Sequence, residues 1–239
     1  MQNLNRIGGI ILARLDSSRL PNKQLQLVRD RYMLDWLIER AKAIKGIDEL
    51  IIATSDRSID DPLEEFAVNY GIECFRGAFA DVAGRVLECT NEREYDAWVR
   101  INGDSPLLDY RLFDFGLDVF RLGNYDVVTN AYERTYPIGN SVEIIDTAIY
   151  ASGYSRMSKN HHYEHVTSYF YENSKEYNIY NFVHKDGAKR KVSLAVDTHG
   201  DLERYTWMLD QVECDHMSLV GDDAISLAAA YANRDEYLP

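Results

Sequence analysis

The chain has 239 residues, of which 46% are hydrophobic and 27% are charged, and its formal net charge is −13 at pH 7. This length supports one domain with at most a subdomain, and the composition is that of a globular protein. The negative charge argues against a nucleic-acid-binding protein, because such proteins usually present a basic face to the phosphates. A bound Mg²⁺ would suit an acidic protein that handles phosphates, since the metal supplies positive charge.

The first predicted element is a buried strand over residues 7–13, and a basic loop follows it directly. Arg14, Arg19 and Lys23 lie within ten residues, Pro21 ends regular structure there, and a helix is predicted over 32–45. A strand, a basic loop and a helix place cations and backbone N–H groups at the carboxyl edge of a sheet, where open α/β folds bind phosphates. The loop therefore predicts a nucleoside triphosphate site, although it contains neither a P-loop nor a GxGxxG pattern.

Strands and helices alternate through the rest of the first half. Strands are predicted over 50–54, 72–77, 97–101 and 125–130, with helices over 63–70, 82–91 and 110–122 between them. Asp60 and Asp81 precede two of these helices and are expected to cap them. The alternation predicts a parallel sheet with helices on both faces and right-handed crossovers between the strands.

The pattern changes over residues 131–191. Strand-like pieces at 141–145 and 178–183 flank a helix predicted over 161–172 that is rich in His and Tyr. We expect 131–191 to be an inserted acceptor-site and dimerisation subdomain, a lid or arm rather than more sheet, within a single domain over 1–239. Three elements are predicted to follow it, namely a strand over 192–197, a helix to about Gln211 and a helix over 223–233.

Two aspartates are expected to meet at the edge of the sheet. Asp104 follows the strand 97–101, beside Gly103, which lets a ligand approach the backbone. Asp197 ends the strand 192–197, which we expect in the same sheet. Since Mg²⁺ is usually held by one or two carboxylates and by substrate phosphates, the pair predicts a metal site. A helix N-cap is the alternative for either aspartate alone.

Other chemistries find less support in the sequence. His161 and His165 are four residues apart, but no HExxH pattern follows, so zinc is not expected. The absence of GxSxG argues against a Ser-His-Asp hydrolase. Cys74, Cys89 and Cys214 form no CxxC pair and predict no disulfide framework, which favours a reducing cytoplasm. No signal peptide is recognised and the first apolar run is too short to span a membrane, so a membrane partner is not expected.

Seven short segments of the chain match the motifs of a known protein family, in the same order as in that family. They lie at 13–23, 53–56, 75–85, 100–107, 136–143, 164–167 and 196–202. In these motifs the chain resembles the cytidylyltransferases of bacterial surface-sugar synthesis. The spore-coat polysaccharide biosynthesis protein F group is the most similar, and it is related to 3-deoxy-manno-octulosonate cytidylyltransferase and CMP-sialic acid synthetase.

The resemblance implies a Rossmann-like nucleotide-diphospho-sugar transferase fold, a mostly parallel three-layer α/β sandwich. It also implies CTP as the donor substrate, Mg²⁺ as the cofactor and a homodimer. The catalytic residues implied are Arg14, Lys23, Asp104 and Asp197, with the two aspartates as metal ligands. The nucleotide-binding residues implied are Ala13, Arg14, Ser18, Arg19, Lys23, Thr54, Asp56, Arg76, Asn102 and Gly103. The acceptor-binding residues implied are Asp81, Arg85, Tyr136, Glu143, Glu164 and His165.

Two positions depart from the family pattern. Ser141 stands where the nearest group often has Asp, and Ser105 where it often has Cys or another small residue. The acceptor therefore stays open among an acidic sugar, an amino sugar, a phosphonate and a phosphorylated polyol. UTP or ATP could replace CTP, and an inactive nucleotide sensor or scaffold is the alternative class. The complete set of predicted catalytic residues favours a nucleotidyltransferase that releases pyrophosphate and supplies a CMP-activated product for surface polysaccharide or glycan synthesis.

Overall fold

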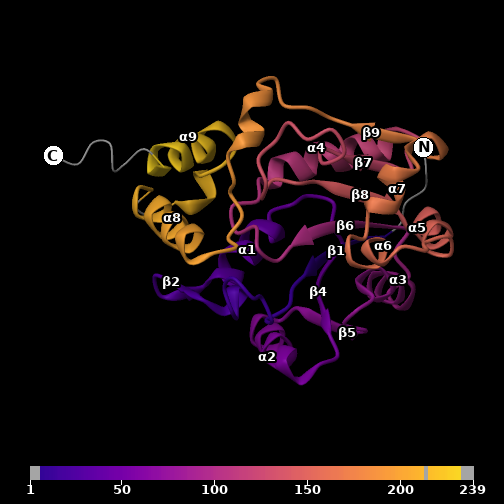
Figure 1. The fold of residues 1–239 in the computed structure, drawn as a ribbon, viewed down its shortest axis with the longest axis horizontal. Helices are drawn as coiled ribbons and strands as arrows, with labels where there is room; N and C mark the ends of the chain where they lie inside the picture. Colours follow the sequence, from indigo (N-terminus) through magenta and orange to yellow (C-terminus); the bar gives the residue numbers. More distant parts are fainter. Residues whose placement is uncertain (1–5, 213–214, 233–239) are drawn as a thin grey trace.

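The structure is a computed structural model that describes residues 6–212 and 215–232 (Figure 1). Cys214 lies outside these residues, while Cys74 and Cys89 are free thiols. Burial raises the pKa of the Cys89 thiol to about 12, so this side chain is a poor nucleophile. Within the described ranges, no helix is both long and apolar enough to cross a membrane.

A seven-stranded sheet in the order β5-β4-β1-β6-β8-β7-β9 forms the centre of the molecule. Its strands are β1 (Ile7–Leu12), β4 (Glu49–Ser55), β5 (Glu73–Gly77), β6 (Ala97–Asn102), β7 (Val127–Thr129), β8 (Glu143–Asp146) and β9 (Ile179–Asn181). The first four in spatial order are parallel, β8 runs antiparallel to both of its neighbours, and β9 is parallel to β7. Two short strands, β2 (Leu27–Val28) and β3 (Arg31–Tyr32), form a separate hairpin. The predicted mostly parallel α/β sheet is confirmed.

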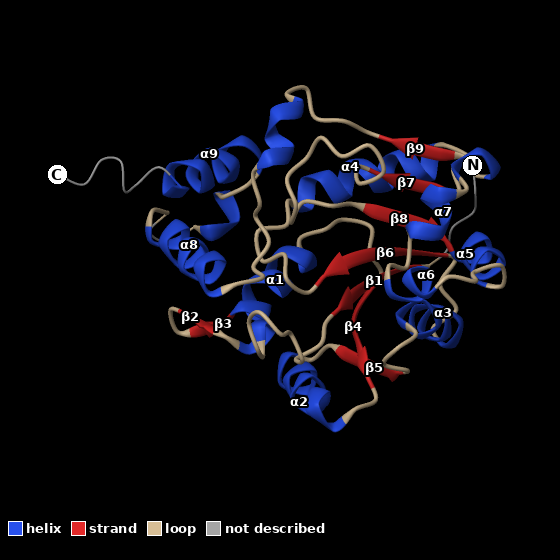
Figure 2. Ribbon diagram, in the orientation of Figure 1, coloured by secondary structure: helices blue, strands red, loops and turns tan. Residues whose placement is uncertain are grey.

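Helices cover both faces of this sheet (Figure 2). One face packs against α1 (Met33–Lys42), α2 (Asp61–Tyr70) and α4 (Tyr110–Leu122), and the other against α3 (Val82–Glu92), α5 (Thr147–Tyr154), α6 (Asn160–Glu164) and α7 (Ser168–Glu172). Successive strand residues point to opposite faces, so Ile11 and Val99 enter the first core whereas Ile10 and Trp98 enter the second. The result is the predicted three-layer sandwich.

Two C-terminal helices pack together outside the main layers, beside α1 (Figure 1). They are α8 (His199–Asp210) and α9 (Gly221–Ala232), and they share an apolar core with Met33 and Trp36 of α1. The helix predicted to reach about Gln211 is confirmed. The helix predicted from 223 is confirmed as far as Ala232, and Asn233 lies outside the described residues.

Two expectations for residues 131–191 are wrong. This segment does add sheet, because it contributes β8 and β9. The helix predicted over 161–172 is divided, with α6 ending at Glu164 and α7 beginning at Ser168. Tertiary contacts account for the break: Val166 is fully buried against the sheet, and the Thr167 hydroxyl donates to Glu143 at 2.6 Å.

The prediction that residues 192–197 form a strand of the central sheet is wrong. That segment makes only an isolated bridge, between Ile138 and Ser193. Its apolar side chains, Leu194 and Val196, are buried in the core formed with α8 and α9, which is why the sequence resembles a buried strand. The Val196 N–H donates to the carbonyl of Asp104 at 2.9 Å, so the segment still passes the tip of β6.

Candidate functional site

A cavity of about 450 Å³ opens at the carboxyl ends of β1 and β6. Seven of the residues predicted to bind nucleotide line it together, namely Ala13, Arg14, Ser18, Arg19, Lys23, Asn102 and Gly103. A Cβ on Gly103 would lie 2.7 Å from the Leu12 carbonyl oxygen, so this position requires glycine because the two strand ends approach closely. Close packing of the backbone therefore explains why residue 103 is a glycine, and this residue also forms part of the cavity wall.

Lys23 connects the two predicted metal ligands. Its Nζ atom donates to Oδ2 of Asp104 and to Oδ1 of Asp197, both at 2.8 Å. Arg19 forms a further ion pair with Asp197 at 3.1 Å. The four groups come from three separate parts of the chain, and the convergence of the aspartates expected from the sequence is confirmed. Asp197 arrives on the extended segment beside β6 rather than at the tip of a sheet strand.

The electrostatics of this cluster suit a cation. Burial disfavours the Lys23 ammonium, but the attraction and hydrogen bonds of Asp104 and Asp197 outweigh burial and raise the pKa of Lys23 above its ordinary value. Lys23 is therefore charged and lies where two carboxylates share one positive group. Two carboxylate ligands match the chemistry that Mg²⁺ prefers, with phosphate oxygens and water completing its coordination. The residues present thus fit a divalent ion, provided that the ammonium moves away.

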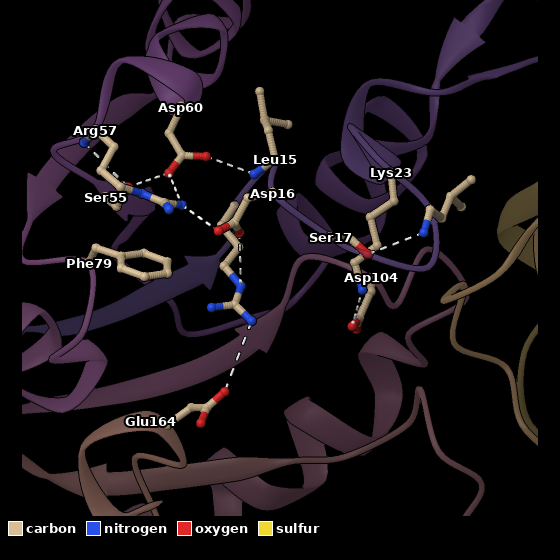
Figure 3. Close-up of polar contacts among 12 residues, drawn as sticks. Leu15, Asp16, Ser17, Lys23, Ser55, Arg57, Asp60, Phe79, Asp104 and Glu164 are labelled. Carbon is tan, nitrogen blue, oxygen red and sulfur yellow. Dashed lines mark hydrogen bonds and ion pairs between the residues drawn. The ribbon is translucent and has the colours of Figure 1, made fainter. Parts of the chain in front are cut away.

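A buried carboxylate holds the start of the basic loop (Figure 3). Asp60 is fully buried, and its Oδ1 accepts from the backbone N–H of Leu15 at 2.7 Å, while its Oδ2 accepts from the Ser55 hydroxyl. The prediction that Asp60 caps α2 is wrong for its side chain, which makes no capping hydrogen bond to that helix. Instead, Asp60 connects the end of β4 to the loop that lines the cavity.

Arg57 adds a second tie to the same loop. Its Nη2 donates to Oδ2 of Asp16 at 2.7 Å, and its guanidinium carbon lies 3.4 Å from the centre of the Phe79 ring (Figure 3). Arg14 approaches the same ring, at 5.7 Å. A cation over an aromatic face is attracted by the negative charge density of the ring. Phe79 belongs to the loop before α3, and its contacts with Arg14 and Arg57 join that loop to the basic loop and to the end of β4.

Four of the six predicted acceptor residues lie in the cavity or in a hollow beside it. Arg85, Glu164 and His165 line the cavity opposite the basic loop, and Glu164 approaches Arg14 at 4.0 Å. Asp81 lines an adjoining hollow, but it caps α3 by accepting from the Gly84 N–H at 2.7 Å, which confirms the predicted cap. Arg85 is buried, and its recorded hydrogen bonds go to the carbonyls of the loop before α3, so it also supports that loop.

Five other predicted site residues do not line this cavity. Arg76 forms ion pairs with Asp61 and Glu64 of α2, and Tyr136 packs on Phe182 and His184 near α9. The remaining three are the buried Thr54, the exposed Asp56 and the buried Glu143. Glu143 is connected to the cavity through another residue, whereas the other four belong to neighbouring surfaces or to the core.

Several cavity residues were not predicted to bind a substrate. Asp16, Ser17 and Gln24 belong to the basic loop, and Arg100 belongs to β6. For the loop residues, proximity to the predicted cations was the available signal. The sequence signal for Arg100 is stronger, because a lone arginine inside the otherwise apolar stretch from Ala97 to Ile101 requires a partner or a ligand.

A cluster of two histidines and a carboxylate lies on α6 and α7. His161 and His162 contact Glu172 at 2.5 and 3.2 Å, and Lys159 contacts it at 2.6 Å. These contacts lower the pKa of Glu172 to about 2, Lys159 contributing most. The histidine and glutamate ligand atoms lie within 4.8 Å of one another. Lys159 already neutralises the carboxylate, so an ion-pair cluster that joins the two short helices explains the arrangement.

The fold and the site together define a class of enzyme. A mostly parallel α/β sheet carries a basic loop and two converging aspartates at its carboxyl edge, where open α/β sheets bind their ligands, and the same fold occurs in a solved cytidylyltransferase, which is a nucleotidyltransferase. The chain belongs to the cytidylyltransferase family, whose model matches residues 9–210.

Individual relatives agree with this assignment. The chain is 30% identical over 210 residues to spore coat polysaccharide biosynthesis protein SpsF of Bacillus subtilis, covering 84% of this chain and 85% of that protein. It is 30% identical over 184 residues to 3-deoxy-manno-octulosonate cytidylyltransferase of Fusobacterium nucleatum, covering 69% and 72% respectively. A solved cytidylyltransferase from Leptospira borgpetersenii superposes with a TM-score of 0.85 at 26% identity, covering 97% of this chain and 95% of that one.

Proposed function

We propose that this enzyme transfers the cytidylyl group of CTP to an acidic sugar or a related acceptor in an Mg²⁺-dependent reaction that releases pyrophosphate. The single observation that carries the proposal is the bridge from Lys23 to Asp104 and Asp197 at 2.8 Å, at the wall of the cavity. It unites a triphosphate-binding cation with two metal-binding carboxylates. CTP as the donor follows the family, and 3-deoxy-manno-octulosonate in the name of the Fusobacterium relative supports an acidic acceptor.

In the proposed reaction, an acceptor oxygen attacks the α-phosphorus of CTP, the bond to the leaving pyrophosphate breaks, and the proton of the acceptor hydroxyl passes to solvent water. Arg14, Arg19 and Lys23 bind triphosphate oxygens and offset the negative charge that develops on the leaving group. Asp104 and Asp197 would hold the metal, and Mg²⁺ would supply further positive charge at the phosphates. The side chains of Arg14 and Arg19 are 47% and 63% exposed, so both can move from their present ion pairs to a bound nucleotide.

The first prediction concerns the donor. In the presence of Mg²⁺ and a panel of acids, the wild-type enzyme should release pyrophosphate from CTP. The rate with UTP, ATP or GTP should be at least about tenfold lower, because these nucleotides would lose at least one contact to the base. A coupled pyrophosphate assay measures this selectivity. Tight CTP binding by calorimetry that needs no metal and gives no turnover with any acid would instead favour the nucleotide sensor or scaffold. A larger rate with another nucleotide would replace CTP as the donor.

The second prediction concerns assembly. We propose that residues 131–191 contain the acceptor side of the site and the contacts of a homodimer. Large apolar side chains are exposed there, with Ile138 at 50% and Val183 at 55%, and Val183 follows β9 at the edge of the sheet. Wild-type protein should have twice the monomer mass by light scattering, and Val183→Glu should shift it to the monomer because a charge cannot be buried there unpaired. A monomeric wild type contradicts this proposal, and the exposed Val68→Glu on α2 is the matched control.

The product is proposed to serve surface polysaccharide or glycan synthesis. The B. subtilis relative is named for spore coat polysaccharide biosynthesis, and this name supports the same general pathway here. We propose a cytoplasmic location, which the free thiols of Cys74 and Cys89 and the use of CTP support.

A further inference from the structure

An arginine and a glutamate face each other inside the sheet, below the cavity. Val99 of β6 pairs with Ile144 of β8 in antiparallel register, so the next pair along the strands is Arg100 and Glu143. Their side chains meet, and Arg100 Nη1 donates to Glu143 Oε2 at 2.9 Å. Both residues point to the face covered by α3, α6 and α7, since alternate strand residues share a face with Trp98. Arg100 also lines the cavity, whereas Glu143 does not.

Glu143 is a fully buried carboxylate whose oxygens are well satisfied. Besides Arg100, it accepts from the Thr167 hydroxyl at 2.6 Å and from the Tyr171 hydroxyl at 2.7 Å, both through Oε1. The Tyr171 hydroxyl also meets the hydroxyl of Thr129 at 2.9 Å. Arg100 comes from β6, Thr167 from the break between α6 and α7, and Tyr171 from α7, where its hydroxyl is also in contact with Thr129 of β7. These contacts hold the carboxylate in one orientation, and so fix the arginine that pairs with it.

Arg100, by contrast, has donors without partners. Within the described residues, only its Nη1 has a recorded acceptor, and its Nε is buried with none. Arginine carries five N–H donors in a planar fork that matches two oxygens of a carboxylate or phosphonate. The buried Nε without an acceptor costs free energy, and the other guanidinium donors at the cavity wall can take oxygen atoms from a ligand.

The other cations of the cavity have acceptors within the protein, most of them at the end of the cavity beside the basic loop. Lys23 and Arg19 contact Asp104 and Asp197, Arg14 contacts Asp16 at 3.4 Å, and the recorded hydrogen bonds of Arg85 go to backbone carbonyls. Two ends of the cavity thus differ in character. The end at the basic loop joins cations to the predicted metal ligands, and the floor of the sheet offers one oriented guanidinium.

We propose that Arg100 binds the oxyanion of the acceptor, and that Glu143, supported by Thr167 and Tyr171, acts as a positioning residue that orients it. This inference rests on the proposed function, because it divides the cavity between CTP and an anionic acceptor. The shared chemistry is a planar or tetrahedral oxyanion, either the carboxylate of an acidic sugar or the phosphorus oxyanion of a phosphonate or polyol phosphate. A neutral amino sugar would leave the guanidinium unpaired.

Calorimetry with separate ligands tests the inference. The anionic probes are 3-deoxy-manno-octulosonate, 2-aminoethylphosphonate and glycerol 3-phosphate, the neutral probe is the methyl ester of the first, and CTP with Mg²⁺ is measured in parallel. Arg100→Gln should weaken binding of the preferred anion by on the order of 10- to 100-fold, as loss of a charge-assisted bidentate contact predicts. Binding of CTP and of the neutral ester should change little. The preferred anion identifies which oxyanion the site takes.

Variants separate this role from a structural one. Because Arg100→Gln leaves the buried Glu143 charge unpaired, the double variant Arg100→Gln/Glu143→Gln removes both charges and guards against misfolding. Glu143→Gln alone should weaken anion binding less than Arg100→Gln does, and should not affect CTP binding. Arg156→Gln, which removes an exposed guanidinium paired with Glu176, is the matched control and should bind every probe as the wild type does.

Two results would overturn the inference. One is that the folded single and double variants bind every anion as tightly as the wild type, and the other is that wild type binds CTP but none of the anions. Failure of the proposed function is a distinct result, in which wild type does not bind CTP with Mg²⁺, and the anion measurements still report on Arg100 in that case.

Discussion

Asp104→Asn is expected to lower kcat by on the order of 10²–10³, the effect of losing one key stabilising group. The substitution preserves the shape of the side chain but removes the charge that faces Lys23 at 2.8 Å and that is proposed to hold the metal with Asp197. Positive charge at the triphosphate would then be poorly placed as the bond to pyrophosphate breaks. Pyrophosphate release at saturating CTP, measured over a range of Mg²⁺ concentrations, checks the prediction, and the variant should require more Mg²⁺.

Asp210→Asn provides the matched control for this experiment. Asp210 lies at the end of α8 and pairs with Arg29 at 3.1 Å, and it does not line the cavity. The control should retain wild-type kcat and the same Mg²⁺ requirement. An Asp104→Asn enzyme with near-normal kcat and an unchanged Mg²⁺ requirement would show that this carboxylate neither binds the metal nor stabilises the transition state.

Asp60→Ala is expected to reduce the free energy of unfolding by about 3 kcal/mol and to weaken CTP binding by about tenfold. The alanine would leave the Leu15 N–H and the Ser55 hydroxyl buried without their acceptor, and it would release Arg57 from a carboxylate 3.6 Å away. Because Leu15 lies between Arg14 and Arg19 in the basic loop, its displacement moves the predicted triphosphate contacts. Urea denaturation measures the first effect, and calorimetry with CTP measures the second.

The amide variant and a neighbouring residue sharpen this test. Asp60→Asn keeps one oxygen that can accept from the Leu15 N–H, so it should recover much of the lost CTP affinity. Asp61→Ala is the control, since Asp61 is about half exposed and pairs with Arg76 on the surface. If Asp60→Ala binds CTP with the wild-type Kd, the basic loop does not depend on this anchor for its function.

Local sequence signals were sufficient for most of the fold. Apolar runs followed by helical periodicity identified β1, β4 and β6 and the helices between them, because each buried strand and each amphipathic helix face carries its own pattern. The basic loop and Asp104 follow directly on such strands, so their place at the carboxyl edge could also be predicted. The strands predicted over 125–130, 141–145 and 178–183 coincide with β7, β8 and β9, but strands of three or four residues carry too little signal to show that β8 and β9 join the central sheet.

Only some of the site residues named from the family motifs line the cavity. Arg14, Lys23 and His165 line the cavity, whereas Arg76 and Tyr136 point to neighbouring surfaces. A motif gives the position of a residue along the chain, but the direction of a long side chain depends on which partner is nearest. For Arg76 the nearest carboxylates, Asp61 and Glu64, belong to α2, and they hold it there.

The hydrophobic and turn pattern of the sequence therefore determined an α/β sheet with a basic loop after its first strand and Asp104 at the end of β6, whereas the nucleotidyltransferase class came from the resemblance of its motifs to a known family. Only the tertiary structure decided how Asp197 arrives, which anchor holds Leu15, and that Arg100 faces Glu143. The first set depends on neighbours in the chain, where hydrophobic pattern and turn residues suffice. The second depends on contacts between segments far apart, such as Asp60 with Leu15, which no local pattern encodes.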